Sequence, residues 1–131
     1  KKVKVIAGKF EKAEGPEKGH NVDPIYFHIK LEEGKEFKCD VPAGHNSFVY
    51  LLAGDLSIGK NKHDKTSNSN LILLDRGDKL IVKANKKSEF LFIAGKPIGE
   101  PIARGGPFVM NTKAEILQAV QDYHNGTFAK Y

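Results

Sequence analysis

The fold is decided by residues 89–126, EFLFIAGKPIGEPIARGGPFVMNTKAEILQAVQDYHNG. Within this stretch, residues 90–94 form an unbroken apolar run that ends at Gly95. A run this short suits a strand covered on both faces better than a helix. Three prolines and four glycines follow within residues 95–107. Because these residues lack the donors and the backbone bias of a regular ladder, we expect a connector that wraps over the surface.

The residues after this connector have the period of a helix. Thr112 and Glu115 stand at the spacing of a capping box, and Gly126 supplies a C-terminal stop. The apolar residues that recur on one face are Ile116, Leu117, Val120 and Tyr123. A helix of about twelve residues is only marginally stable alone. We therefore predict that this face, Leu117 included, is buried against the rest of the domain.

The rest of the chain alternates short apolar runs with turn signals. The runs cover residues 3–7, 25–31, 36–41, 47–53, 56–58, 71–74 and 80–83. Gly54 with Asp55 predicts a tight hairpin turn, and residues 85–88 predict another turn. The strands that result number about eight, which suits an all-β jelly-roll barrel. We assign the barrel to residues 1–110 and the helix to residues 111–126, packed on the barrel within the same domain.

Composition excludes some classes of protein. The chain has 131 residues and a net charge of +5, with 40% hydrophobic and 28% charged residues, as in ordinary globular proteins. No apolar run approaches the roughly 20 residues of a membrane span. Arg76 and Arg104 are the two arginines, which argues against a module that reads a nucleic-acid sequence. The alternative is a weak, salt-sensitive attraction to polyanions, centred on the loop with Lys60, Lys62, His63 and Lys65.

The single cysteine, Cys39, cannot form an internal disulfide and has no zinc spacing. It points to a reducing compartment, the cytoplasm, or the nucleus if the source is eukaryotic. We interpret Cys39 as a small strand residue and not as a nucleophile. The first residue is Lys1, and we expect the chain to be a processed or truncated piece.

The five histidines do not stand at the spacing of a shared metal site. His20 and His63 fall in predicted polar loops, and His124 falls at the end of the predicted helix. Residues 25–31 alternate cleanly, so His28 is predicted on the more polar face of a half-buried strand.

Several stretches of the sequence resemble one protein family. Residues 94–112, AGKPIGEPIARGGPFVMNT, and 122–128, DYHNGTF, resemble the C-terminal half of the pirin family, and residues 106–112 are the most specific part. Residues 3–10, VKVIAGKF, and 47–54, SFVYLLAG, extend the resemblance over nearly the whole chain. The resemblance implies an RmlC-like cupin, a double-stranded β-helix jelly-roll barrel with one C-terminal helix.

A catalytic cupin holds its metal with histidines and one glutamate, and this chain replaces them. Laid against that pattern, Ser47 stands at the glutamate, Pro42 or Ala43 at the second histidine, and Ser88 at the last histidine, while His45 is off register. We therefore predict no catalytic, cofactor-binding or metal-binding residue in this chain. In the family, the iron site belongs to the N-terminal half, so iron is expected there.

Three functions are compatible with these residues. We favour a non-catalytic cupin half that supports an iron-bearing N-terminal cupin half; the resemblance implies quercetin 2,3-dioxygenase activity and an iron-dependent transcriptional cofactor role for the whole assembly. Its partner is that half, another copy of itself or another protein. The second function is a stand-alone module that binds a small molecule or a protein, and the third is a cupin enzyme with a non-standard metal site. The candidate pocket, at the barrel mouth, comprises His28, His45, Ser47, Tyr50, Ser88 and Glu89.

Overall fold

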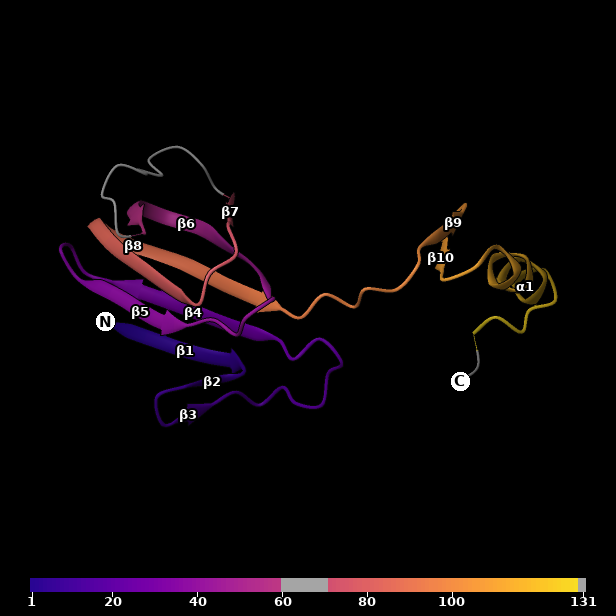
Figure 1. Cartoon of the computed structure of the whole chain (residues 1–131), viewed down its shortest axis with the longest axis horizontal. Helices are drawn as coiled ribbons and strands as arrows, with labels where there is room; N and C mark the ends of the chain where they lie inside the picture. Colours follow the sequence, from indigo (N-terminus) through magenta and orange to yellow (C-terminus); the bar gives the residue numbers. More distant parts are fainter. Residues whose placement is uncertain (60–70, 130–131) are drawn as a thin grey trace. The chain divides into compact units, whose positions relative to one another are not determined.

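The computed structural model describes residues 1–59 and 71–129, which form two compact units (Figure 1). The first unit is Lys1–Pro97 and the second is Ile98–Tyr131. The division falls earlier than the predicted boundary after residue 110. Packing of the helix on the barrel stays a prediction, and the basic loop at residues 60–65 lies outside the described residues.

The first unit is built from antiparallel strands. Its described strands are β1 (Lys2–Ala7), β2 (Lys9–Phe10), β3 (Ala13–Glu14), β4 (Ile25–Leu31), β5 (Glu36–Asp40), β6 (Asn46–Ile58), β7 (Leu71–Leu74) and β8 (Lys79–Gly95). The main sheet has the order β1-β4-β8-β6-β7, and β5 also pairs with β8. Strands β2 and β3 form a small separate hairpin.

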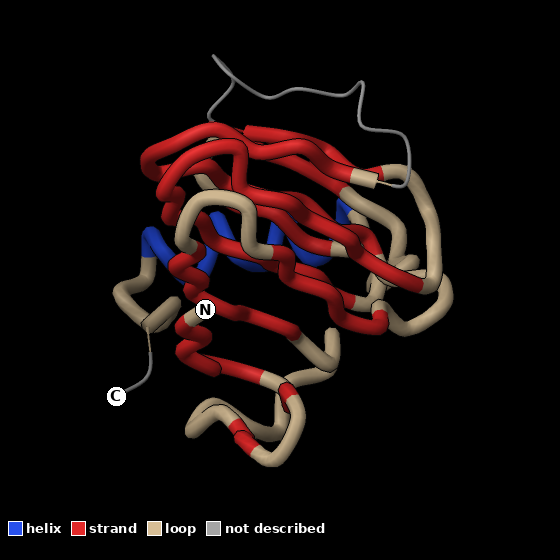
Figure 2. Tube along the Cα trace, turned by 90° about the vertical axis from the view of Figure 1, so that its left-hand side faces the viewer, coloured by secondary structure: helices blue, strands red, loops and turns tan. Residues whose placement is uncertain are grey.

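Two predicted turns are wrong, because the strands β6 and β8 continue through these positions. At Gly54, β6 bulges instead of turning: the backbone φ is 104°, and its pairing with β8 is irregular between Leu51 and Leu56. Residues 85–88, predicted as a turn, lie inside β8. The first part of β8 pairs with β5, and the last part pairs with β4. The sheet therefore folds over on itself (Figure 2).

The core lies between the two layers of this folded sheet. The ring of Phe37 on β5 lies 6.4 Å from that of Phe27 on β4 and 6.1 Å from that of Phe90 on β8. All three side chains are fully buried, and a buried phenylalanine contributes about 1.5–3 kcal/mol. Side chains from both layers therefore fill the interior.

The other side of the sheet faces away from the core, and we call it the outer face. In β4, buried Phe27 and Ile29 alternate with more exposed Tyr26, His28 and Lys30. The predicted position of His28 on the more polar side of its strand is confirmed. The same alternation continues on the neighbouring strands β8 and β6.

The second unit is a short hairpin followed by a helix. Strands β9 (Ala103–Gly105) and β10 (Phe108–Met110) pair where no ladder was expected. The helix α1 (Lys113–His124) begins with the predicted capping box: the Thr112 hydroxyl accepts from the Glu115 backbone, whose carboxylate accepts from the Thr112 backbone. No helix among residues 1–59 and 71–129 is long and apolar enough to cross a membrane.

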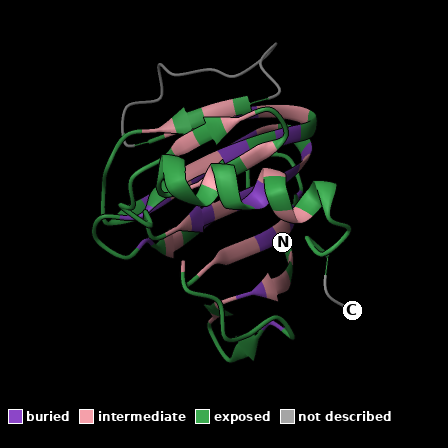
Figure 3. Cartoon of the chain, turned by 90° about the vertical axis from the view of Figure 1, so that its right-hand side faces the viewer, coloured by how far each residue is buried: buried purple, intermediate pink, exposed green. Residues whose placement is uncertain are grey.

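Packing of the apolar helix face against the first unit stays a prediction, and within the second unit two residues of this face are exposed. Leu117 and Tyr123 are each 66% exposed, and most of the helix is drawn as exposed in Figure 3. The ring of Tyr123 does contact that of Phe108 at 6.1 Å. Ala119 is the buried residue of the helix.

Replacing Gly54 by alanine tests the bend in β6. A Cβ atom at this position would lie 2.6 Å from Cα of Ser88, so backbone would have to move. The left-handed backbone costs an alanine about 1–2 kcal/mol, and overpacking adds about 1–3 kcal/mol. Urea unfolding should show the sum of both losses.

Gly34→Ala is the matched control, because Gly34 has a φ of 75° but nothing within 4 Å of an added Cβ. Its free energy of unfolding should fall only by the cost of the left-handed backbone, about 1–2 kcal/mol. Equal losses for the two variants would mean that the contact with Ser88 does not matter.

Candidate functional site

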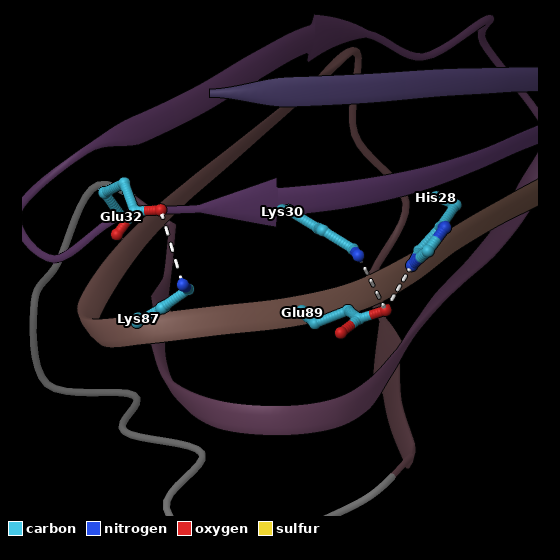
Figure 4. Close-up of polar contacts among 5 residues, drawn as sticks. All are labelled: His28, Lys30, Glu32, Lys87 and Glu89. Carbon is cyan, nitrogen blue, oxygen red and sulfur yellow. Dashed lines mark hydrogen bonds and ion pairs between the residues drawn. The ribbon is translucent and has the colours of Figure 1, made fainter.

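The closest polar pair among the candidate residues joins His28 on β4 to Glu89 on β8. Nε2 of His28 donates to Oε1 of Glu89 at 2.7 Å, and Nζ of Lys30 lies 3.9 Å from the same oxygen (Figure 4). A second pair, Lys87 with Glu32 at 3.9 Å, is more exposed. The His28 and Glu89 side chains are only 25% and 36% exposed, but surface ion pairs contribute at most about 1 kcal/mol. The pair links the side chains of β4 and β8 on the outer face.

Ser88 is buried at the bend where β6 and β8 lose register. Its hydroxyl accepts from the Asp55 backbone N–H at 3.0 Å and lies 2.7 Å from the Lys86 carbonyl, to which it donates. The side chain is 3% exposed. The Ser88 hydroxyl thus makes its hydrogen bonds to the backbone of the bend.

His45 lies in the turn before β6. It is 8% exposed, and its Nε2 lies 3.3 Å from the backbone oxygen of Asp23. Its Nδ1 has no hydrogen-bond partner in the described part of the chain. Ser47 is half-buried on β6, and Tyr50, further along β6, is 38% exposed on the outer face.

The structure therefore brings His28 into contact with Glu89 and places Tyr50 on the same face, with Leu91 of β8 between Tyr50 and His28. Ser88 points into the bend, whereas His28 and Tyr50 lie on the outer face, so the six do not line one pocket. A ligand-binding role for any of them stays a prediction.

The residues that the sequence analysis assigns to the cupin ligand positions do not fit a metal. Pro42 and Ala43 offer no donor, and Ser47 and Ser88 offer hydroxyls in place of imidazole and carboxylate. The bonds of Ser88 to the backbone also leave it no role as a ligand. Within residues 1–59 and 71–129, no three His, Cys, Asp or Glu side chains gather closely enough to hold a metal ion.

Sequence reasoning missed a polar network at the bend. Nδ2 of Asn85 donates to Oγ of Ser57 at 3.0 Å and lies 3.3 Å from Oδ1 of Asp55. Asn85 was predicted in a turn, where asparagine is common. No local signal links it to residues about thirty positions earlier, because that contact depends on the register of β6 with β8.

Sequence reasoning also missed a cavity of about 560 Å³ beside the β2–β3 hairpin. Its lining includes Lys9, Glu14, Lys18 and Asp40. The Glu14 carboxylate lies 3.8 Å from Lys9 and 3.4 Å from Lys18. Glu14 is therefore paired with two lysines of the lining, whereas Asp40 lies 3.8 Å from Lys79.

Cys39 on β5 has the environment of an inert thiol. Burial, and to a smaller extent the adjacent Asp40 carboxylate, raises the pKa of Cys39 to about 12. A thiol with so high a pKa is almost entirely protonated at neutral pH, and the thiolate is the reactive form.

The fold and the site define a class: a jelly-roll unit whose interior is filled by side chains, followed by a small helical unit. Residues 26–129 match the Pirin C-terminal cupin domain, and the chain belongs to this family. The predicted resemblance and the predicted cupin fold are both confirmed.

The chain matches part of each of several longer proteins. It is 39% identical over 104 residues to human pirin, covering 77% of this chain and 36% of pirin. It is 36% identical over 127 residues to a pirin-like protein of Caulobacter vibrioides, covering 96% of this chain and 45% of that protein. The crystal structure of a quercetin 2,3-dioxygenase from Acinetobacter baumannii is similar with a TM-score of 0.79 and 33% identity, over 98% of this chain and 44% of that one. The chain thus spans less than half the length of the curated relatives it matches.

Slow alkylation is predicted for Cys39. At pH 8 the raised pKa leaves on the order of a thousandfold less thiolate than an unfolded cysteine has. Iodoacetamide labelling, followed by mass spectrometry with and without guanidinium, measures the ratio. Asp40→Asn should speed labelling of the folded chain slightly, because it removes the smaller of the two causes. Equal labelling rates in the folded and unfolded chain would show that the thiol is not protected.

Proposed function

We propose that this chain is the non-catalytic cupin half of a pirin-like protein and supports a second, iron-bearing cupin half. The quercetin 2,3-dioxygenase activity named for its structural relative, and an iron-dependent role as a transcriptional cofactor, would belong to the assembly of both halves. In this proposal the chain contributes a rigid, filled barrel that buttresses the metal-bearing half and shields it from solvent.

The observation that carries this proposal is the hydrogen bonding of the Ser88 hydroxyl. A cupin ligand at this position would have to face the interior with a free donor atom, whereas the Ser88 hydroxyl is bonded to the Asp55 and Lys86 backbone. Gly54 has no room for a side chain because it abuts Ser88. The position that would hold a metal thus holds the bend together.

The length of the relatives supports a division of labour between two halves. The chain covers 45% of the Caulobacter protein, and the remainder of that protein is long enough for another domain of similar size. A metal site in that remainder would explain why a relative is named a quercetin 2,3-dioxygenase although this half lacks the metal ligands of a catalytic cupin.

The chain alone is predicted to bind no iron and to have no dioxygenase activity. The purified chain is incubated with ferrous iron without oxygen, excess metal is removed, and bound iron and quercetin turnover are measured. We expect less than about 0.1 iron per chain, because serine hydroxyls and prolines are poor ligands for such metals.

The quercetin 2,3-dioxygenase from Acinetobacter baumannii, taken through the same steps, serves as the control for the turnover assay. One tightly held iron per chain that is lost in His45→Ala would overturn the proposal and favour an enzyme with a non-standard site.

A further inference from the structure

The chain has one asparagine that is followed by glycine, Asn125 before Gly126. This pair can modify itself, because glycine has no side chain to hinder its backbone nitrogen. The Gly126 nitrogen attacks Cγ of Asn125, a C–N bond forms, and the side-chain amide leaves as ammonia, so that a succinimide ring results. Water then opens the ring at either carbonyl. The products are aspartate and isoaspartate, and in isoaspartate the main chain runs through the former side chain.

The same two residues form the C-terminal cap of α1. Asn125 is the C-cap residue, and Gly126 follows it in the left-handed conformation with a φ of 72°. The Gly126 N–H donates to the Tyr123 carbonyl at 3.1 Å. The Thr127 N–H donates to the Asp122 carbonyl at 2.8 Å. These two bonds make a Schellman motif, which satisfies carbonyls that the end of a helix would otherwise leave without a partner.

The cap opposes ring closure in two ways. A five-membered ring needs the Gly126 nitrogen on the same side of the Asn125 Cα–C bond as Cβ, and the ψ of −4° at Asn125 turns this nitrogen away. The attacking nitrogen also has its N–H bonded to the Tyr123 carbonyl. Asn125 itself is exposed, so water reaches it. Protection therefore comes from the backbone geometry of the cap and not from burial.

Neither product restores the cap. Isoaspartate adds a methylene to the main chain before Gly126, which displaces the N–H groups of Gly126 and Thr127 from their acceptors. Both products also place a negative charge at the C-terminal end of the helix, where the helix dipole disfavours it. The ring of Phe128, just beyond the cap, lies 4.9 Å from that of Phe108, so this contact depends on the same turn of chain.

We propose that Asn125 is a self-modification site that the C-terminal cap of α1 holds inactive, and that opening of the cap converts it irreversibly to aspartate or isoaspartate. The cap is therefore a one-way device, since it closes again after most openings but not after the reaction. The inference does not depend on the proposed function, because it concerns the second unit and uses neither a partner nor a metal.

The test compares the rate of this conversion in the folded chain with the rate in the chain unfolded by guanidinium, at the same pH and temperature. Digestion and liquid chromatography with mass spectrometry separate the asparagine, aspartate and isoaspartate forms of the peptide that contains residue 125. The folded chain should react about fivefold or more slowly, because the reaction needs a local opening of the cap. Asn111 is the internal control: its Nδ2 donates to the Pro101 carbonyl at 2.8 Å, and it should stay unmodified in the folded chain.

Two variants of Thr127 test whether the backbone bonds of the cap give the protection. Thr127→Pro removes the N–H that is bonded to Asp122, and it should raise the ratio of the folded to the unfolded rate about threefold or more. Thr127→Val is the matched control, since it keeps the N–H and the branched shape and loses only the hydroxyl, which lies 3.3 Å from the same carbonyl. Its ratio should equal that of the original chain.

Equal rates in the folded and unfolded chain would overturn the proposal, because the cap would then give no protection. A ratio for Thr127→Pro no higher than that for Thr127→Val would also overturn it, since the backbone bond would not be what holds the site inactive. Absence of conversion at residue 125 in the unfolded chain would show that the pair is not reactive, and this result is equally contrary.

Discussion

The pairing of β6 with β8 is the interaction on which the rest of the first unit depends. Strand β8 also pairs with β4 and β5, so β1 is joined to the sheet through β4, and β7 is joined through β6. The two long strands can bend together only because Gly54 leaves room for Ser88. The hydroxyl of Ser88 then satisfies the backbone where the ladder is interrupted, and a buried backbone group without a partner is costly.

Local signals predicted local structure well and failed where a distant strand decided the outcome. The capping box of Thr112 and the alternation of residues 25–31 depend on neighbours in sequence, and both are present. Gly54 with Asp55 has the composition of a hairpin turn, but β8 pairs along both sides of it and keeps β6 extended. Periodicity identifies the helix face that carries Leu117 but not what covers it, so its packing on the first unit stays a prediction.

The candidate site also has features that a local pattern predicts and features that depend on distant strands. Laid against the cupin pattern, Ser47 and Ser88 are predicted at the ligand positions, and the structure shows what the Ser88 hydroxyl bonds to. The pairing of His28 with Glu89 spans 61 positions of sequence, and it follows from the register of β4 with β8, which no short motif encodes. The outer face could be predicted strand by strand, but its continuity across four strands needed the strand order.

The strand order also has a consequence for how this chain folds. Among the described strands, β4 pairs with β1 and β8. One edge of β4 therefore has no partner until the residues of β8 up to about residue 95 have been made. Contacts between distant residues slow folding, because a long loop must close before any of them forms. During synthesis, the apolar residues of β4 would stay uncovered until β8 emerges, and uncovered apolar residues beside an unpaired strand edge favour aggregation.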